Sequence, residues 1–149
     1  MTEQTPACDV LDGFWKKGRE FLGTRYAIMG GAMSWISERH LVSAISNAGG
    51  FGVIASGAMP PELLEQEILE TRKMTENNFG VNLITMHPRL DELIDVCIRQ
   101  KVSHVILAGG IPTALSVKKL KDAGCRVMCF APALVLAKKM MRIGADALI

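Results

Sequence analysis

Short apolar runs rich in β-branched residues recur along the chain at intervals of roughly 20 to 30 residues, the spacing of strands separated by helices. The runs cover residues 26–29, 52–55, 80–84, 104–107, 126–130 and 147–149. Most of them are continuous rather than alternating, as expected for strands that are covered on both faces. The pattern therefore predicts six buried strands, the sixth of which reaches the last residue of the sequence.

The segments between these runs carry apolar residues at helical spacing. The clearest stripe is formed by Leu90, Leu93, Ile94, Cys97 and Ile98, which follow the i, i+3, i+4, i+7, i+8 template. Glycines occur where the helices are expected to end, and prolines occur where they are expected to begin. These residues are Gly49, Gly124, Gly144, Pro60, Pro61, Pro88, Pro112 and Pro132.

Strands that alternate with helices predict parallel βα units with right-handed crossovers. An open doubly wound sheet and a (β/α)8 TIM barrel both fit, and the regular spacing favours the barrel. A complete barrel has eight units in typically about 250 residues, whereas this chain supplies five units and the start of a sixth strand. We expect a truncated barrel over residues 26–149, preceded by an N-terminal extension over residues 1–25. Its uncovered sheet edges favour a homo-oligomer, or a non-catalytic half-barrel that pairs with itself or with another chain.

Composition argues against several classes of protein. The 149 residues are 49% hydrophobic and 21% charged, as in a globular domain, and the net charge of +2 is spread along the chain. A nucleic-acid-binding protein usually has a basic stripe or stacking aromatic residues, and the sequence has neither. The N-terminus contains early acidic residues, so no signal peptide is predicted. The uncharged run 41–61 is interrupted by glycine and proline, so it predicts no membrane span, and a cytoplasmic protein is expected.

The cysteines show no metal-binding pattern. They are Cys8, Cys97, Cys125 and Cys129, and no two of them have C-x-x-C spacing. Buried, reduced thiols in a cytosolic protein are the expectation.

The candidate chemistry lies where the predicted strands end, because both α/β architectures bind ligands at the C-terminal ends of their strands. Small residues dominate these ends, which read MGGAMSW, ASGAMPP, NLITMHP, LAGGIP and FAPA. Gly30-Gly31 and Gly109-Gly110 each form either a tight turn or a place where main chain approaches a broad ligand. Gly50-Phe51-Gly52 precedes its strand, which excludes a dinucleotide-binding fingerprint.

Polar side chains at these ends are few. Asn82 lies inside an apolar strand, where its amide needs either a neighbouring main-chain group or a ligand as hydrogen-bond partner. His87 follows the same strand and either caps a helix before Pro88, which we favour, or contacts substrate. His40 and His104 are expected to be structural, and no histidine–carboxylate or serine–histidine arrangement can be assembled.

Three longer stretches resemble the 2-nitropropane dioxygenase, or nitronate monooxygenase, family. They are IMGGAMSWISERHLVSAISNAGGFGVIASGAMPPELLEQEI, FGVNLITMHP and APALVLAKKMMRIGADALI, and the similarity runs from about Tyr26 to the last residue. The related bacterial flavin-dependent enoyl-acyl-carrier-protein reductase shares the pattern. The resemblance implies a TIM barrel that binds FMN and oxidises alkyl nitronates with O2. An enoyl-reductase-like enzyme is the nearest alternative, and a phosphate-binding barrel without flavin is a further one.

The resemblance also implies roles for individual residues. Seven positions match flavin-contacting positions of the family, namely Gly30, Gly31, Ala32, Met33, Asn82, Gly109 and Gly110. Phe130 stands where some relatives carry a flavin-contacting lysine, and Pro132-Ala133 stands where others have Pro-Ser. The family's catalytic histidine and phosphate-binding loops correspond to positions beyond Ile149. No catalytic residue is therefore assigned, and the 149-residue chain alone is expected to be inactive.

Overall fold

The computed structural model describes residues 6–149, with side chains from residue 10 onward, so the side chain of Cys8 lies outside the described residues. Five strands form one parallel sheet in the order β1-β2-β3-β4-β5. They are β1 (Gly52–Ala55), β2 (Phe79–Ile84), β3 (His104–Ala108), β4 (Arg126–Cys129) and β5 (Ala147–Leu148). Each strand pairs with the next one in the sequence, without the reversal of strand order that marks a doubly wound sheet. This order is that of successive βα units in a TIM barrel.

Helices connect the strands and cover one face of the sheet. They are α2 (Arg39–Asn47), α3 (Pro61–Met74), α4 (Leu90–Arg99), α5 (Ala114–Asp122) and α6 (Leu134–Arg142). Between α3–α5 and the sheet lies the main core, which includes Ile54, Leu64, Val81, Leu83, Leu93, Ile94, Val105, Leu107, Leu120 and Val127. The predicted stripe on α4 is confirmed, since Leu93, Ile94 and Cys97 are fully buried. The glycines that follow α2, α5 and α6 have positive φ, as predicted for helix ends.

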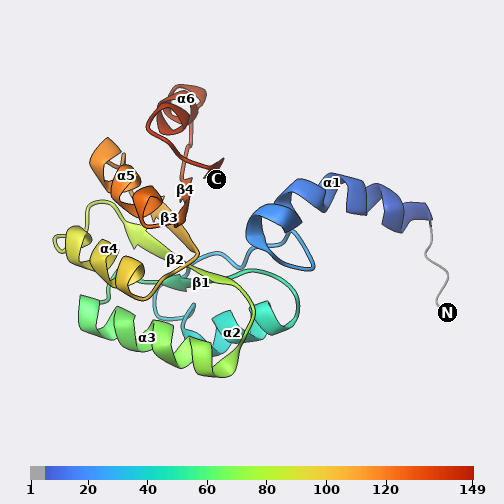
Figure 1. Ribbon diagram of the computed structural model, residues 1–149, viewed down its shortest axis with the longest axis horizontal. Coiled ribbons are helices and arrows are strands. Elements are labelled where there is room, and N and C mark those ends of the chain that lie inside the picture. The colour runs from blue at the N-terminus through green and yellow to red at the C-terminus, as the bar shows by residue number, and fades with distance from the viewer. Residues whose placement is uncertain (1–5) are drawn as a thin grey trace.

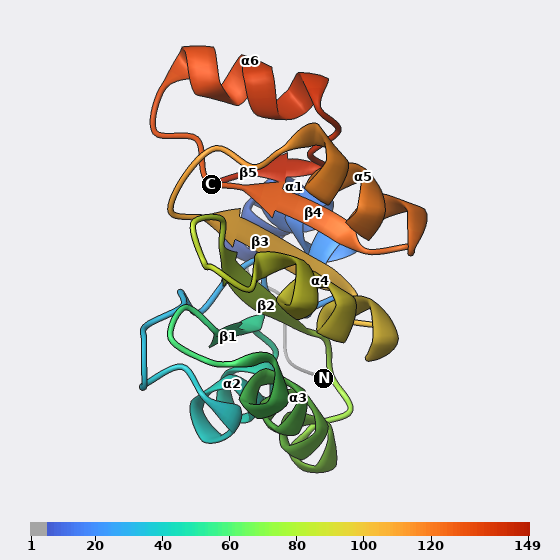
Figure 2. The ribbon, with the colours of Figure 1, turned by 90° about the vertical axis from the view of Figure 1, so that its left-hand side faces the viewer.

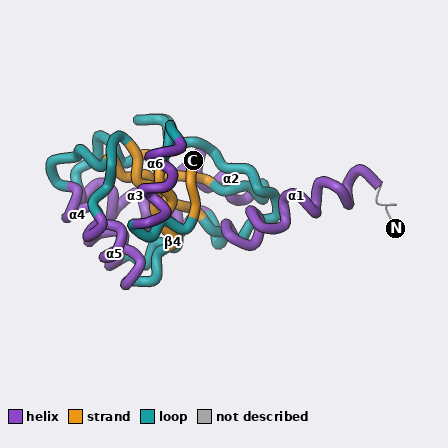
Figure 3. The backbone as a smooth tube through the Cα atoms, turned by 90° about the horizontal axis from the view of Figure 1, so that it is seen from above, coloured by secondary structure: helices purple, strands orange, loops and turns teal. Residues whose placement is uncertain are grey.

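The opposite face of the sheet, which we call the inner face, carries Phe51, Val53, Ile106 and Met128. Helix α1 (Pro6–Leu22) lies on this side, across the sheet from α3, α4 and α5 (Figures 1 and 2). Only its C-terminal end packs on the sheet, and the rest of the helix projects from the body of the molecule (Figure 3).

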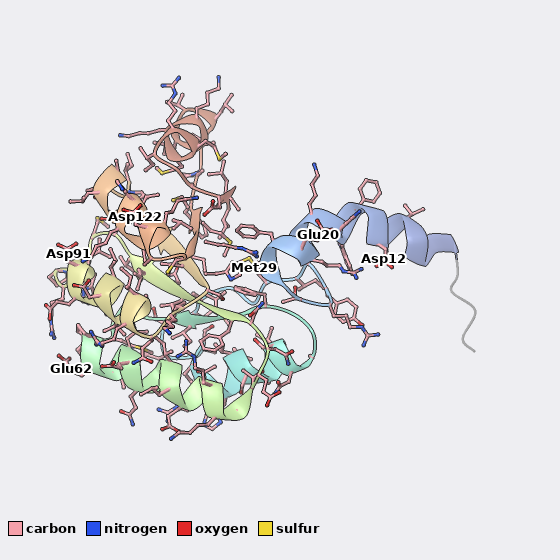
Figure 4. All side chains as sticks on the ribbon, viewed as in Figure 1. Asp12, Glu20, Met29, Glu62, Asp91 and Asp122 are labelled. Atoms are coloured by element: carbon pink, nitrogen blue, oxygen red, sulfur yellow. The ribbon has the colours of Figure 1, made fainter. Side chains whose placement is uncertain are left out.

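The end of α1 is held by a buried histidine at the start of β3. The Nε2 atom of His104 lies 2.8 Å from Phe21 O, and its ring packs edge-on against Phe21 and Phe51, with centroids 5.2 and 4.9 Å apart. Arg126 also donates to the Phe21 carbonyl. Met29 lies between the sheet and the end of α1 (Figure 4) and packs against the inner-face cluster. The expected structural role of His104 is therefore confirmed.

The predicted strand over residues 26–29 is wrong as a full strand. Only Met29 forms a β-bridge, to Phe51, with hydrogen bonds from Phe51 N to Ile28 O and from Gly30 N to Phe51 O, both of 2.9 Å. Beyond this point the main-chain partner of β1 is no longer a strand, because Ala55 N donates to Ser37 O at 3.0 Å. The loop that contains Ser37 therefore takes the place of a neighbouring strand at the end of β1.

Within residues 6–149, no helix has the length and apolar content needed to cross a bilayer. Over the same residues, no group of three or more His, Cys, Asp or Glu side chains is close enough to hold a metal ion.

Candidate functional site

The C-terminal ends of β1, β2 and β3 meet at one edge of the sheet. Ile84, the last residue of β2, lies between the loops that follow β1 and β3. A Cβ added to Gly57 would lie 3.0 Å from Ile84 Cγ1, and one added to Gly109 would lie 2.9 Å from Ile84 Cγ2. Gly109 also has a φ of +74°, so its lack of a side chain has a conformational reason as well as a packing reason.

Asn82 lies on the inner face next to this edge. It is in register with Ala55 and with Ile106, and the side chain of Ile106 belongs to the inner-face cluster. The main-chain carbonyl oxygen of Asn82 accepts hydrogen bonds from Ser56 N at 3.2 Å and from Ser56 Oγ at 2.7 Å. Asn82 is only 8% exposed, yet its side-chain amide bonds to no other residue of the described chain. Of the two partners predicted for this amide, a neighbouring main-chain group is therefore absent among the described residues, and the ligand role stays a prediction.

The two glycines of the Gly30-Gly31 pair have different environments. A Cβ on Gly30 would lie 2.4 Å from Ile45 Cδ1 on α2, so close packing of this helix accounts for that glycine. Gly31 has no atom within 4 Å of the equivalent Cβ position, and its surroundings in the protein do not require glycine. The main-chain N–H groups of Gly31 and Ala32 donate to no other residue within 6–149. Gly31 therefore has exposed, unbonded main chain, and its contact with a ligand stays a prediction.

Not all predicted site residues lie at the same level of the sheet. Gly30 is bonded to Phe51, which precedes β1, whereas Asn82 is level with Ala55, the last residue of β1. The loop after Gly30 returns to the level of Ala55 through Ser37, whose carbonyl accepts from Ala55 N. The hydroxyl of Ser37 also bonds Gly31 O and Met33 N, so these residues are linked to the end of β1, whereas Gly30 is bonded near its start.

The Gly109-Gly110 loop packs on the residue that follows β2. A Cβ on Gly110 would lie 2.6 Å from Thr85 Oγ1 and 3.5 Å from Met86 Cγ. Among the described side chains, Thr85 Oγ1 is the buried polar atom without a hydrogen-bond partner. Thr85 gives no signal in the sequence, because one threonine after an apolar strand carries no distinctive pattern.

His87 does not face the site as a free side chain. Its Nδ1 atom accepts a hydrogen bond from Arg89 N at 3.1 Å, and its carbonyl accepts one from Leu90 N at the start of α4. The ring therefore bonds to the N–H of Arg89, the residue before α4, which agrees with the loop or capping role that we favoured over substrate contact.

The loops of the edge contain few charged groups, and the nearest ones are paired. Arg89 binds Glu62 and Glu92 at 2.9 and 2.7 Å, which lowers the pKa of both carboxyl groups and raises that of Arg89. The acidic side chains of Glu62, Asp91 and Asp122 lie on the helical layer, away from the inner face (Figure 4). The edge therefore offers main-chain and amide hydrogen bonds rather than a charged clamp.

Known proteins resemble this chain in sequence and in fold. Residues 16–95 match the family model "Nitronate monooxygenase". A curated relative, the (3aS,4S,5R,7aS)-5-hydroxy-7a-methyl-1-oxo-octahydro-1H-indene-4-carboxyl-CoA dehydrogenase of Rhodococcus jostii (strain RHA1), is 35% identical over 130 residues, covering 87% of this chain and 36% of the relative. A probable nitronate monooxygenase of Staphylococcus aureus (strain MSSA476) is 26% identical, covering 91% of this chain and 48% of the relative. The chain thus spans about a third to a half of the length of these relatives.

Solved structures give the same result. The structure of FabK from Thermotoga maritima superposes with a TM-score of 0.86 at 38% identity, covering 89% of this chain and 42% of that protein. The nitroalkane oxidase from Streptomyces ansochromogenes has a TM-score of 0.80 at 23% identity, covering 88% and 47%, which supports the fold alone. These neighbours confirm the barrel architecture, and the chain belongs to the nitronate monooxygenase family.

Proposed function

We propose that this chain forms part of the flavin-ring wall of an FMN-dependent oxidoreductase. The observation that carries the proposal is the open main chain at Gly31 and Ala32, together with the Asn82 side-chain amide, which bonds to no other described residue. A flat heterocyclic ring carries both donors and acceptors, and it fits an edge that offers main-chain and amide groups beside apolar side chains such as Ile84. Gly31, Ala32 and Met33 would line one side of the ring, Asn82 would bond its edge, and the Gly109-Gly110 loop would close the slot.

When bound, FMN supplies the redox chemistry, while the residues of this chain bind and orient the ring. The proposed reaction is the oxidation of alkyl nitronates with O2. Among the described histidines, we assign none to proton transfer. His87 caps α4, His40 is exposed on α2, and His104 is buried under the end of α1.

A second candidate is a flavin-dependent reductase of the enoyl-acyl-carrier-protein type. Two similarities support keeping this candidate, the 38% identity to FabK from Thermotoga maritima and the 35% identity to the carboxyl-CoA dehydrogenase of Rhodococcus jostii. Oxygen consumption with an alkyl nitronate supports the first candidate, and NAD(P)H-driven reduction of an enoyl thioester supports the second. Absence of both activities in the 149-residue chain is the expected result for a chain without an assigned catalytic residue.

We further propose that residues 26–149 form the barrel part and residues 1–25 an N-terminal extension that leads into it. Apolar side chains are exposed at both edges of the sheet. At one edge Ile28 is 54% exposed, and at the other Leu148 and Ile149 are 38% and 43% exposed. This exposure favours self-association through the edges. Light scattering coupled to size exclusion tests this, with a defined dimer expected and a monomer contradicting it. The buried free thiols Cys97, Cys125 and Cys129 support a cytoplasmic location.

Binding of FMN to the purified chain tests the main proposal directly. FMN fluorescence should be quenched on titration with the wild-type chain, and Gly31→Ala should weaken the affinity at least about tenfold because its methyl group occupies the ring's position. The matched control is Gly13→Ala on α1, where an added Cβ also has no neighbour within 4 Å. Quenching by neither chain, or equal quenching by wild type and Gly31→Ala, contradicts the assignment.

A further inference from the structure

Ser37 connects the open loop of the site to the end of β1. It lies just before α2 and is 3% exposed. Its Oγ atom donates to Gly31 O at 2.9 Å and accepts from Met33 N at 3.0 Å. Its main chain makes two more bonds, because Ser37 N donates to Met33 O at 2.8 Å and Ser37 O accepts from Ala55 N at 3.0 Å. One residue therefore closes the loop on itself and fixes it to the sheet.

The same loop contains a backbone conformation that needs such support. Trp35 has a φ of +63°, in the left-handed region that bulky residues seldom adopt. Its side chain is 68% exposed, so packing of the indole ring does not hold this conformation. The hydrogen bonds on either side of Trp35, made by Ser37 and Met33, are the interactions that fix it.

The bonds of Ser37 also determine which groups of the loop remain for a ligand. Gly31 O and Met33 N are used by the serine hydroxyl, which leaves the N–H groups of Gly31 and Ala32. The bond from Ala55 N to Ser37 O links Ser37, and through its hydroxyl the Gly31–Met33 main chain, to the end of β1, where Ala55 is in register with Asn82.

We propose that Ser37 is a positioning residue for the ligand of this site, acting through the Gly31–Met33 main chain. The inference rests on the proposed flavin-binding function, and it assigns to Ser37 the order of the loop rather than a contact with the ring. A hydroxyl with one donor and two acceptor positions bridges a carbonyl and an N–H in the loop, which an alanine cannot do.

If Ser37 only stabilised the fold, its replacement would leave the order of the loop and the ligand affinity unchanged. Ser43 provides the matched control. Ser43 is also a serine with 3% exposure, but its hydroxyl donates to His40 O within α2, at 3.1 Å, and does not reach the loop. Ser43→Ala therefore removes one buried serine hydrogen bond and leaves the loop intact.

The experiment compares Ser37→Ala, Ser37→Thr and Ser43→Ala in the 149-residue chain by two measurements. Hydrogen exchange followed by mass spectrometry reports the order of residues 31–36 without ligand, and FMN fluorescence titration reports affinity. We expect Ser37→Ala to speed exchange in 31–36 about tenfold and to weaken FMN binding about tenfold, the effect of losing one or two hydrogen bonds. Ser37→Thr should restore both values to within about twofold of wild type, and Ser43→Ala should change neither.

Unchanged exchange in residues 31–36 of Ser37→Ala overturns the proposal, whether or not FMN binds. Faster exchange with unchanged FMN affinity also overturns it, because the loop order would then be irrelevant to the ligand. Failure of the wild-type chain to quench FMN counts against the proposed function, while the exchange measurement still decides whether Ser37 orders the loop. If Ser37→Thr fails to fold by circular dichroism, the comparison of Ser37→Ala with Ser43→Ala decides the outcome.

Discussion

Replacing Gly52 with alanine tests the closest approach of helix and sheet in this fold. Gly52 is the first residue of β1, and α2 crosses directly over it. An added Cβ would lie 2.4 Å from Val42 O and 2.9 Å from both Val42 C and Val42 Cα. These are main-chain atoms of a helix, so no side-chain rotation can relieve the contact.

The size of the effect follows from the displacement that the methyl group requires. Ordinary van der Waals contact begins near 3.4 Å, so α2 must move by about 1 Å. Overpacking of this kind costs about 1–3 kcal/mol. The movement also weakens the 3.2 Å hydrogen bond from Gly52 N to Ser46 Oγ, at about 1 kcal/mol. We expect a loss of about 2–4 kcal/mol in the free energy of unfolding, a large fraction of the stability of an ordinary domain.

Urea denaturation followed by circular dichroism measures this loss, and thermal unfolding should show a decrease in Tm of about 5–10 °C. Gly31→Ala is the control, because its Cβ has no neighbour within 4 Å and its stability should stay within about 0.5 kcal/mol of wild type. A Gly52→Ala variant as stable as this control would refute the close packing of α2 on β1.

Three further predictions use other parts of the chain. Gly30→Ala should lower the free energy of unfolding, because its Cβ would contact Ile45 Cδ1. Adding Ile45→Val, which removes that atom, should recover part of the lost stability. If urea denaturation shows that the effects of the two substitutions simply add, this explanation is contradicted. Burial lowers the pKa of His104 below its ordinary 6.5, so as the pH falls the unfolded chain binds the proton before the folded chain does. The free energy of unfolding should therefore decrease as the pH falls from 6.5 toward the folded-state pKa. His104→Gln should remove this pH dependence, whereas the control His40→Gln, at an exposed residue, should leave it unchanged. Burial also raises the pKa of the Cys129 thiol to about 11, so peptide mapping should find it unmodified by iodoacetamide at about pH 8 in the native chain and modified in guanidinium chloride.

Much of the fold was predictable because local patterns carry it. Continuous apolar runs and the stripe on α4 are properties of neighbouring residues, and β1 to β5 appear within about one residue of their predicted limits. Glycines after helices were equally predictable, since a left-handed residue at a helix end is a local requirement. The prediction for residues 26–29 failed because the length of a strand depends on its partner, and the segment opposite residues 26–28 is the turn that ends α2, where Tyr26 N donates to Gly49 O.

The candidate site was predictable in its location but not in the reasons for its residues. The end of each strand indicates where a ligand binds in this architecture, and His87 was correctly favoured as a cap. The roles of the two glycines at 30 and 31 depend on α2, which packs on one and leaves the other open. Ser37 and Thr85 were missed because single small polar residues form no periodic or motif signal.

The amino-acid sequence by itself determined the order of strands and helices, the apolar faces that bury them, and the strand ends that carry small residues, since these depend on spacing along the chain. Only the tertiary structure decided which glycine is packed and which is open, that the Asn82 amide lacks a protein partner, and that His104 holds the end of α1. The physical reason is that these properties arise from contacts between residues distant in sequence, such as His104 and Phe21.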